Sequence, residues 1–213
     1  YTIEEGDEIV DQKSKASTDP QLMNMLKDLR KQIADKKGIP PFVIFQDPSL
    51  EDMAIQYPIT LDELQNIAGV GQGKANRYGK PFVELISNYV EENEIDRPQD
   101  FVVKSIVNKS GMKVQLIKNI DKKMPLEDIA DAQGKEVSEV ISELESVVFS
   151  GTKVNLDYYI DEILDEDAQE EIYDYFTEAD SDTMSAAMEE FDDDYTEEEL
   201  RLMRIKFFSE YAH

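Results

Sequence analysis

The chain has 213 residues, of which 40% are hydrophobic, so it is long enough for one large or two small domains. No stretch approaches the roughly 18 uninterrupted apolar residues that a membrane span requires. No basic and apolar signal stands at the N-terminus, so we expect a cytoplasmic protein without a membrane partner. The absence of cysteine excludes disulfides and thiolate metal sites. Because residue 1 is Tyr, we interpret the chain as a piece of a longer protein.

The formal net charge of -26 is distributed unevenly along the chain. Residues 22 to 90 carry 8 basic and 8 acidic side chains, whereas residues 151 to 213 carry 4 basic and 21 acidic ones, a net charge of -17. A protein that binds nucleic acid is expected to present a basic face, so the overall charge argues against tight binding. The asymmetry between the two ends indicates separate roles for them.

Residues 1 to 19 are polar and lack an apolar period, so we interpret them as a linker that ends in a helix start. From Leu22 onward, apolar residues recur at intervals of three and four, which predicts a helix that ends at Gly38. The apolar stripe of this helix consists of Leu22, Met25, Leu26, Leu29 and Ile33. Residues 41 to 45, PFVIF, form a short apolar run between helices, which we interpret as buried extended chain.

Two short helices are predicted next, each with a side-chain acceptor at its cap and an acid three residues later. These pairs are Ser49 with Asp52 and Thr60 with Glu63. The stretch IAGVGQGKANRYG, residues 67 to 79, then predicts a helix, a glycine turn and a second helix.

The glycine turn has the composition of a phosphate-binding loop, but its spacing fits no nucleotide-binding motif. A P-loop requires G-x-x-x-x-G-K-[ST], and here Ala68 and Ala75 occupy the first glycine position and the hydroxyl position. A dinucleotide-binding G-x-G-x-x-G would need its third glycine at Lys74 or Asn76. The glycines therefore serve either a tight turn between packed helices or the close approach of backbone to some other phosphate.

A charged stretch over residues 94 to 100 predicts a second linker, followed by a helical unit over residues 101 to 150 with a break at residues 109 to 111. Residues 124 to 148 have the pattern of a helix-turn-helix with its turn at Gly134. The second helix presents four glutamates where a DNA-reading helix presents basic or amide side chains. We therefore expect a structural role for this unit.

Residues 151 to 213 predict an acidic helical extension with aromatic residues at helical spacing. Its last helix is predicted to begin at Thr196, with Glu199 completing the cap. The consecutive acids at residues 192 to 194 do not match a calcium loop, where the ligands alternate. Since His213 is the only histidine and the last residue, no catalytic set can be assembled, and we expect that this chain alone is not an enzyme.

Several motifs occur in a fixed order: the Asp28-Leu29-Arg30 helix, VIFQDPSLEDMA (43 to 54), YPIT (57 to 60), and ELQNIAGVGQGKANRYG, which ends at Gly79. In order and spacing they resemble the helicase and RNase D C-terminal domain, or HRDC domain. The resemblance implies a compact HRDC bundle over residues 20 to 93 of an all-α chain. The helix-turn-helix-like unit and the acidic extension that follow are similar to the C-terminal extension of some bacterial RecQ-like helicases.

This resemblance implies the C-terminal region of a bacterial RecQ-like ATP-dependent DNA helicase that acts in DNA repair and recombination. The motor, with its ATP and Mg²⁺, is then expected in a preceding part of the protein. The parent helicase core is an expected partner, through which the chain would be associated with the nucleoid in the bacterial cytoplasm.

The resemblance also implies weak binding of single-stranded or branched DNA through a basic face of the HRDC domain. The implied residues lie on the first helix and around the glycine turn, where phosphate neutralisation would release counterions. They are Lys27, Arg30, Lys31, Lys36, Lys37, Gly71, Gly73, Lys74, Arg77 and Lys80. The alternative is a protein-interaction or autoregulatory module, in which acidic residues 151 to 213 dock on a basic protein partner or on the DNA-binding face of the parent helicase. A purely structural spacer is the third possibility.

Overall fold

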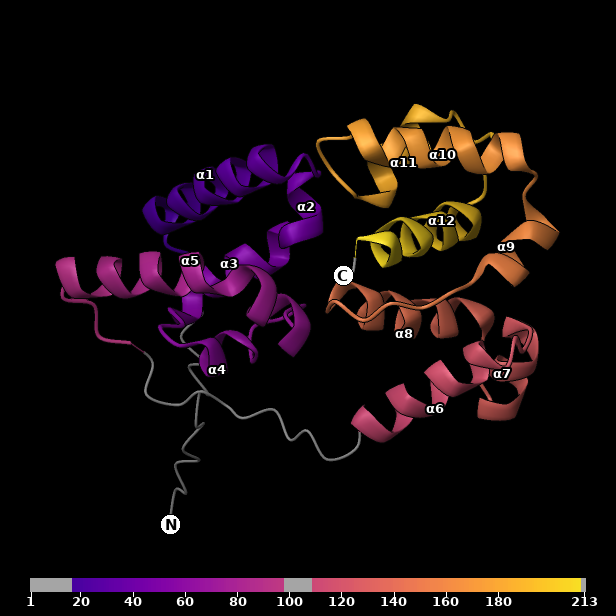
Figure 1. Cartoon of the computed structure of the whole chain (residues 1–213), viewed down its shortest axis with the longest axis horizontal. Coiled ribbons are helices and arrows are strands. Elements are labelled where there is room, and N and C mark those ends of the chain that lie inside the picture. The colour runs from indigo at the N-terminus through magenta and orange to yellow at the C-terminus, as the bar shows by residue number, and fades with distance from the viewer. Residues whose placement is uncertain (1–16, 98–108, 212–213) are drawn as a thin grey trace, which may run out of the picture.

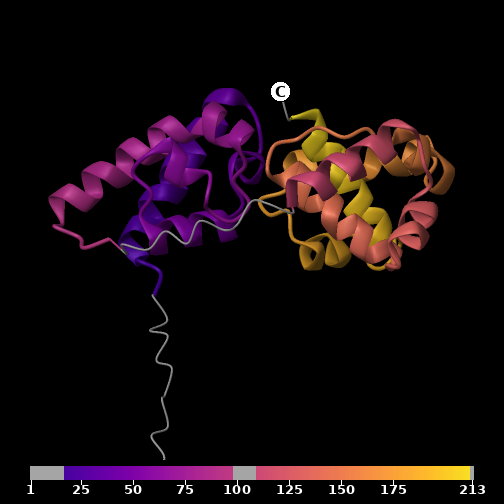
Figure 2. The same ribbon diagram turned by 90° about the horizontal axis from the view of Figure 1, so that it is seen from below.

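The computed structural model describes residues 17–97 and 109–211, and these two ranges form twelve helices and no strand. The prediction of an all-α fold is therefore confirmed. The helices fall into two groups that lie side by side (Figures 1 and 2). We call residues 17–97 the N-terminal unit and residues 109–211 the C-terminal unit.

The N-terminal unit contains five helices: α1 (Pro20–Lys37), α2 (Pro41–Ile44), α3 (Asp47–Gln56), α4 (Leu61–Leu64) and α5 (Gln72–Glu92). The side chain of Asp19 caps α1 by accepting hydrogen bonds from the first backbone N–H groups, and Gly38 ends α1 in the left-handed conformation. Asp19 also accepts hydrogen bonds from the hydroxyls of Tyr57 and Tyr89, at 3.1 and 2.9 Å. One carboxylate thus joins the start of the unit to α5.

The core of the N-terminal unit lies between α1, α3 and α5. Leu22 and Leu26 of the predicted stripe are fully buried, and its other three members pack against the core from partly buried positions. Phe45 meets Phe82 edge to face, with ring centroids 4.9 Å apart. The predicted helix and its apolar face are confirmed.

Two local predictions in the N-terminal unit are wrong. The run from Pro41 to Ile44 is the short helix α2 and not extended chain. Ser49 does not cap a helix, because α3 begins two residues earlier with Pro48 in its first turn, where proline is favoured. The Ser49 hydroxyl instead donates a 2.6 Å hydrogen bond to the carbonyl of Ala68. The predicted cap at Thr60 is confirmed, since its side chain accepts from the N–H of Glu63.

The C-terminal unit contains seven helices: α6 (Lys109–Asp121), α7 (Leu126–Gln133), α8 (Val137–Phe149), α9 (Asp157–Ile163), α10 (Glu166–Glu178), α11 (Met184–Glu190) and α12 (Glu197–Glu210). Helix α12 lies at its centre, between α8 and α10 (Figure 1). Most of its side chains are buried, as expected of a helix enclosed by others. The predicted cap at Thr196 and Glu199 is confirmed.

The predicted helix-turn-helix is confirmed as α7 and α8, with Gly134 left-handed at the end of α7. Residues 109 to 111, where a break is predicted, are helical and form the start of α6, and the residues just before them lie outside the described ranges. The unit's predicted apolar start at residues 101 to 107 lies outside the described residues, as does His213.

One hydrophobic core spans the C-terminal unit. Leu144 of α8, Ile160 of α9, Phe176 of α10 and Phe207 of α12 all belong to it, so residues on both sides of the predicted boundary at residue 150 share one core. Among the helices of both described ranges, none is long and apolar enough to cross a membrane.

Candidate nucleic-acid interface

Four of the implied lysines lie on α1 and are exposed. Lys27 and Lys31 lie one turn apart on one face of the helix, whereas Lys36 and Lys37, in the last turn, point in other directions around it. No ion pair found within residues 17–97 involves any of them. The exposed acids Asp28 and Asp35 of the same helix weaken the positive potential of this face but leave the ammonium groups accessible. This face of α1 can meet a phosphate without rearrangement.

Arg30, by contrast, is turned inward. Its guanidinium forms a 2.7 Å ion pair with Asp47 and donates a 2.8 Å hydrogen bond to the carbonyl of Phe45. These contacts fix the junction between α2 and α3. Arg30 would therefore have to leave two partners before it bound a phosphate.

The conformation of the glycine turn is set by α3. Gly69 has φ +74°, a value that favours glycine, and a Cβ atom there would lie 2.8 Å from the Ser49 hydroxyl. Asp52 accepts a 2.8 Å hydrogen bond from the N–H of Ala68. Gly71 has an ordinary φ of -92°, yet a Cβ atom there would lie 2.5 Å from the carbonyl oxygen of Ser150. Gly69 thus serves the turn, and Gly71 serves the close approach of the C-terminal unit.

Lys74, in the first turn of α5, is covered by the C-terminal unit. Only 5% of it is exposed, its Nζ lies 5.4 Å from the centre of the Phe208 ring, and Gly151 packs on its aliphatic chain. Burial lowers the pKa of the Lys74 ammonium to about 7, a shift that the nearby Asp182 carboxylate opposes. In this arrangement Lys74 is not accessible to nucleic acid.

Arg77 lies at the edge of the same contact. Its guanidinium donates a 3.1 Å hydrogen bond to the carbonyl of Tyr211 and lies 5.7 Å from the ring of Tyr78. Lys37 of α1 lies at the same distance from that ring, so the structure brings the end of α1 and the start of α5 together. Lys80, one turn further along α5, is exposed, as is Gly73.

Three contacts that local sequence patterns do not indicate hold the two units together. The ring of Phe42 lies 6.2 Å from that of Phe207 and 5.8 Å from that of Phe208. Phe42 and Val43 therefore belong to the core of the C-terminal unit although they lie on α2. The side-chain amide of Gln46 donates a hydrogen bond to Asp182. The apolar run PFVIF is thus divided between the two cores, since Ile44 and Phe45 are buried in the N-terminal unit.

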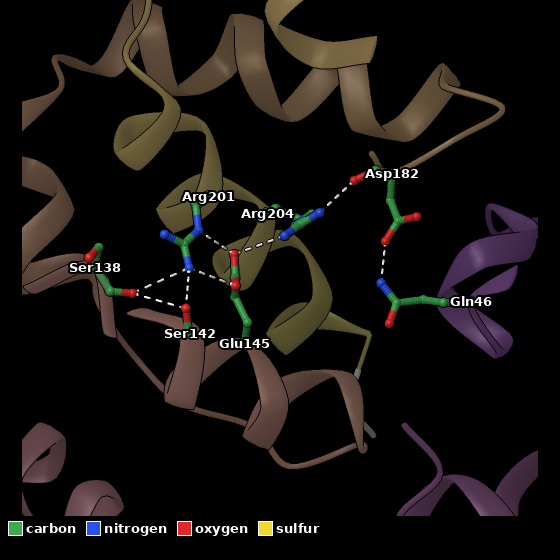
Figure 3. A network of polar contacts seen from close by, with 7 residues as sticks. All are labelled: Gln46, Ser138, Ser142, Glu145, Asp182, Arg201 and Arg204. Carbon is green, nitrogen blue, oxygen red and sulfur yellow. Dashed lines mark hydrogen bonds and ion pairs between the residues drawn. The ribbon is translucent and has the colours of Figure 1, made fainter. Parts of the chain in front are cut away.

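A polar network in the C-terminal unit positions Asp182 (Figure 3). The Glu145 carboxylate accepts hydrogen bonds from Arg201 at 2.9 Å and from Arg204 at 2.8 Å. Arg204 in turn donates a 2.7 Å hydrogen bond to the backbone carbonyl of Asp182. The Asp182 side chain then points away from this network and toward Gln46 (Figure 3).

The helix-turn-helix offers little to a nucleic acid through its second helix. Glu136, which caps α8, and Glu139 in its first turn are exposed, and the lysine that precedes them, Lys135, forms an ion pair with Glu143. Within residues 17–97 and 109–211, no group of three His, Cys, Asp or Glu side chains is placed to hold a metal ion.

Two family models match this chain. Residues 19–86 match the HRDC domain, and residues 110–160 match the RecQ-1-like helix-turn-helix domain. The chain therefore carries an HRDC domain followed by a helix-turn-helix domain of RecQ-1-like type, and the predicted resemblance is confirmed.

The curated relatives are helicases. An ATP-dependent DNA helicase RecQ from Haemophilus influenzae is 45% identical over 74 residues, which is 35% of this chain and 12% of the relative. The corresponding protein of Bacillus subtilis is 42% identical over 69 residues, 32% of this chain and 12% of the relative. The ATP-dependent helicase wrn-1 of Caenorhabditis elegans is 25% identical over 146 residues, 64% of this chain and 14% of the relative. The matches thus span only a small part of each relative.

Proposed function

We propose that this chain is a non-catalytic accessory region of a RecQ-like DNA helicase in DNA repair and recombination, and that its HRDC domain binds single-stranded or branched DNA weakly. The observation that carries the proposal is the accessible basic face of α1 on a domain that matches the HRDC model. ATP and Mg²⁺ belong to the motor of the parent protein, and the helicase core is the partner that this region assists.

The residues proposed to contact DNA first are the exposed lysines of the N-terminal unit, Lys27, Lys31, Lys36, Lys37 and Lys80. Each ammonium that meets a phosphate displaces a condensed counterion, so binding falls as salt concentration rises. With about four such contacts on single-stranded DNA, the logarithm of the binding constant is expected to fall with a slope of about -3 against the logarithm of salt concentration. Weak, salt-sensitive binding suits a module that helps to place a separate motor.

Fluorescence anisotropy of labelled single-stranded and forked DNA at low salt tests this proposal on the full chain. The double variant Lys27→Ala with Lys31→Ala should bind several-fold more weakly than the wild type. Lys118→Ala with Lys122→Ala, one residue in the last turn of α6 and one just after it, removes the same charge at the same sequence spacing and is the matched control. Equal losses in the two variants, or no binding by the wild type, would contradict the proposal.

The second candidate function is a protein-interaction or autoregulatory module that works through the acidic C-terminal part. It is supported by the charge of residues 151 to 213, where 21 acids face 4 basic residues. Three of those basic residues, Arg201, Arg204 and Lys206, already form ion pairs inside the unit. The exposed acids at residues 192 to 194 are therefore available to a basic partner.

This second function is best tested by changing surface charge, because deleting residues 151 to 213 would remove half of a shared core. Asparagine tolerates the positive φ of Asp192 and Asp193, so Asp192→Asn, Asp193→Asn and Asp194→Asn should leave the fold intact. We expect the triple variant to bind an oligolysine peptide more weakly than the wild type at low salt. Unchanged binding would count against the acidic surface as a docking site.

A further inference from the structure

Three of the ten residues implied in DNA binding, Gly71, Lys74 and Arg77, meet the C-terminal unit, and of these Lys74 is buried while Arg77 is half-buried. Lys74 is enclosed by Phe208 and Gly151, and Arg77 donates to the carbonyl of Tyr211. The carbonyl oxygen of Ser150 approaches the turn so closely that it leaves no room for a side chain on Gly71. A phosphate and the C-terminal unit cannot both occupy this side of the glycine turn.

The contact between the units is limited, and each unit keeps a core of its own. The buried residues of the N-terminal core lie between residues 22 and 89, and the C-terminal core takes the buried Phe42 and Val43 from the N-terminal unit, while the partly buried Ile39 packs against both cores. Around this apolar contact stand the two hydrogen bonds of Gln46 and Arg77. Enclosing the Lys74 ammonium opposes docking, because a charge taken out of water is costly unless it is well paired. Separation would therefore leave two folded units and return one charged group to water.

We propose that the C-terminal unit masks part of the DNA-binding face, so that Lys74 is uncovered, and Arg77 is released from Tyr211, only when the two units separate. The proposal rests on the proposed DNA binding of the HRDC domain. Docking and binding at the glycine turn are then mutually exclusive, and by linkage DNA shifts the chain toward the separated state. The exposed lysines of α1 make the first contact, and Lys74 and Arg77 add to it once the turn is uncovered.

Gly71→Ala is the variant that should open the contact without changing any charge. The φ of Gly71 suits alanine, and the only serious clash of the added Cβ lies across the interface, at Ser150. Gly111→Ala is the control, because a Cβ there would meet no atom within 4 Å and Gly111 is not among the residues implied in DNA binding. In anisotropy measurements on the full chain, Gly71→Ala should bind single-stranded DNA at least about fivefold more tightly than the wild type, while Gly111→Ala should not.

The gain in DNA affinity must also depend on Lys74 and Arg77, the basic residues that separation of the units releases. Adding Lys74→Ala and Arg77→Ala to the Gly71→Ala variant should remove the gain, whereas the same two substitutions in the wild type should change affinity little. A gain that persists without Lys74 and Arg77 would overturn the proposal.

Cross-linking the two units in the docked arrangement gives the converse measurement, because it prevents them from separating. The chain has no cysteine, so Gln46→Cys with Asp182→Cys introduces the only two, and a short bismaleimide can bridge them across the interface. The same variant treated with a monofunctional maleimide is the control, and it should bind DNA more tightly than the bridged protein. Equal affinity of the two forms would overturn the masking proposal even if Gly71→Ala failed to open the contact. If no form bound DNA at all, the proposed function itself would fail.

Discussion

The carbonyl oxygen of Ser150 lies 2.5 Å from the place that a Cβ atom on Gly71 would occupy. This contact joins the end of α8 to the turn before α5. It explains why residue 71 is a glycine without any need for a bound phosphate. The turn that has the composition of a phosphate-binding loop is, in this chain, where the two units dock.

Replacing Lys74 by Met should stabilise the protein at neutral pH. Burial lowers the pKa of Lys74 to about 7 from 10.5, so below pH 7 the docked protein bears the full cost of a buried ammonium. As pH rises from 7 to 10.5 the folded form loses its proton first, and the stability of the wild type should rise. The free energy of unfolding of Lys74→Met, measured with urea, should therefore exceed that of the wild type by on the order of 2–4 kcal/mol at pH 7 and by less at pH 9.5. An advantage that is the same at both pH values would refute the burial argument.

Removing the Glu145 carboxylate should destabilise the C-terminal unit strongly. In Glu145→Gln, Arg201 and Arg204 lose their shared partner, and both are largely buried. We expect the free energy of unfolding, measured with urea, to fall by about 3 kcal/mol. Glu143→Gln is the comparison, because its ion pair with Lys135 is more exposed, and it should cost less than about 1 kcal/mol. Similar losses in the two variants would show that the network is not essential.

Phe42 should matter for the arrangement of the units, whereas Phe45 should matter only within its own core. Phe42→Ala removes the contact of the Phe42 ring with the rings of Phe207 and Phe208, and Phe45→Ala removes the contact between the rings of Phe45 and Phe82. Each substitution should cost about 3 kcal/mol or more. Only Phe42→Ala is expected to raise the radius of gyration in small-angle X-ray scattering under native conditions, and an unchanged radius would argue against its role in docking.

The salt dependence of DNA binding should report which lysines contact phosphate. Losing Lys27 and Lys31 should reduce the magnitude of the slope by about 1.4, since each contact on a single strand contributes about 0.7. Lys118→Ala with Lys122→Ala should leave the slope unchanged. Titrations between low and moderate salt give both slopes, and equal slopes for wild type and the Lys27/Lys31 variant would exclude phosphate contacts by this face.

Much of the fold could be predicted from local patterns. The stripe that starts at Leu22, the cap at Thr60 and the helix-turn-helix around Gly134 depend on residues within one or two helical turns, where periodicity and capping carry the information. The start of α3 could not be placed correctly, because Ser49 bonds to Ala68 across the unit in place of capping its own helix.

The candidate site was predictable in residue type but not in accessibility. The lysines of α1 are exposed, as helical spacing indicates. Lys74 and Arg77 are equally basic in the sequence, yet Lys74 is covered by Phe208 and Arg77 is bonded to the carbonyl of Tyr211, and both partners lie far away along the chain. Local patterns say which face of a helix is polar, and they do not say which other unit packs on it.

Hydrogen–deuterium exchange of the full chain, with and without single-stranded DNA, follows both DNA binding by α1 and the release of the C-terminal unit in one measurement. We expect slower exchange along α1 when DNA is added, together with faster exchange at residues 148 to 154, where the C-terminal unit leaves the glycine turn. Unchanged exchange along α1, or slower exchange at residues 148 to 154, would contradict this expectation.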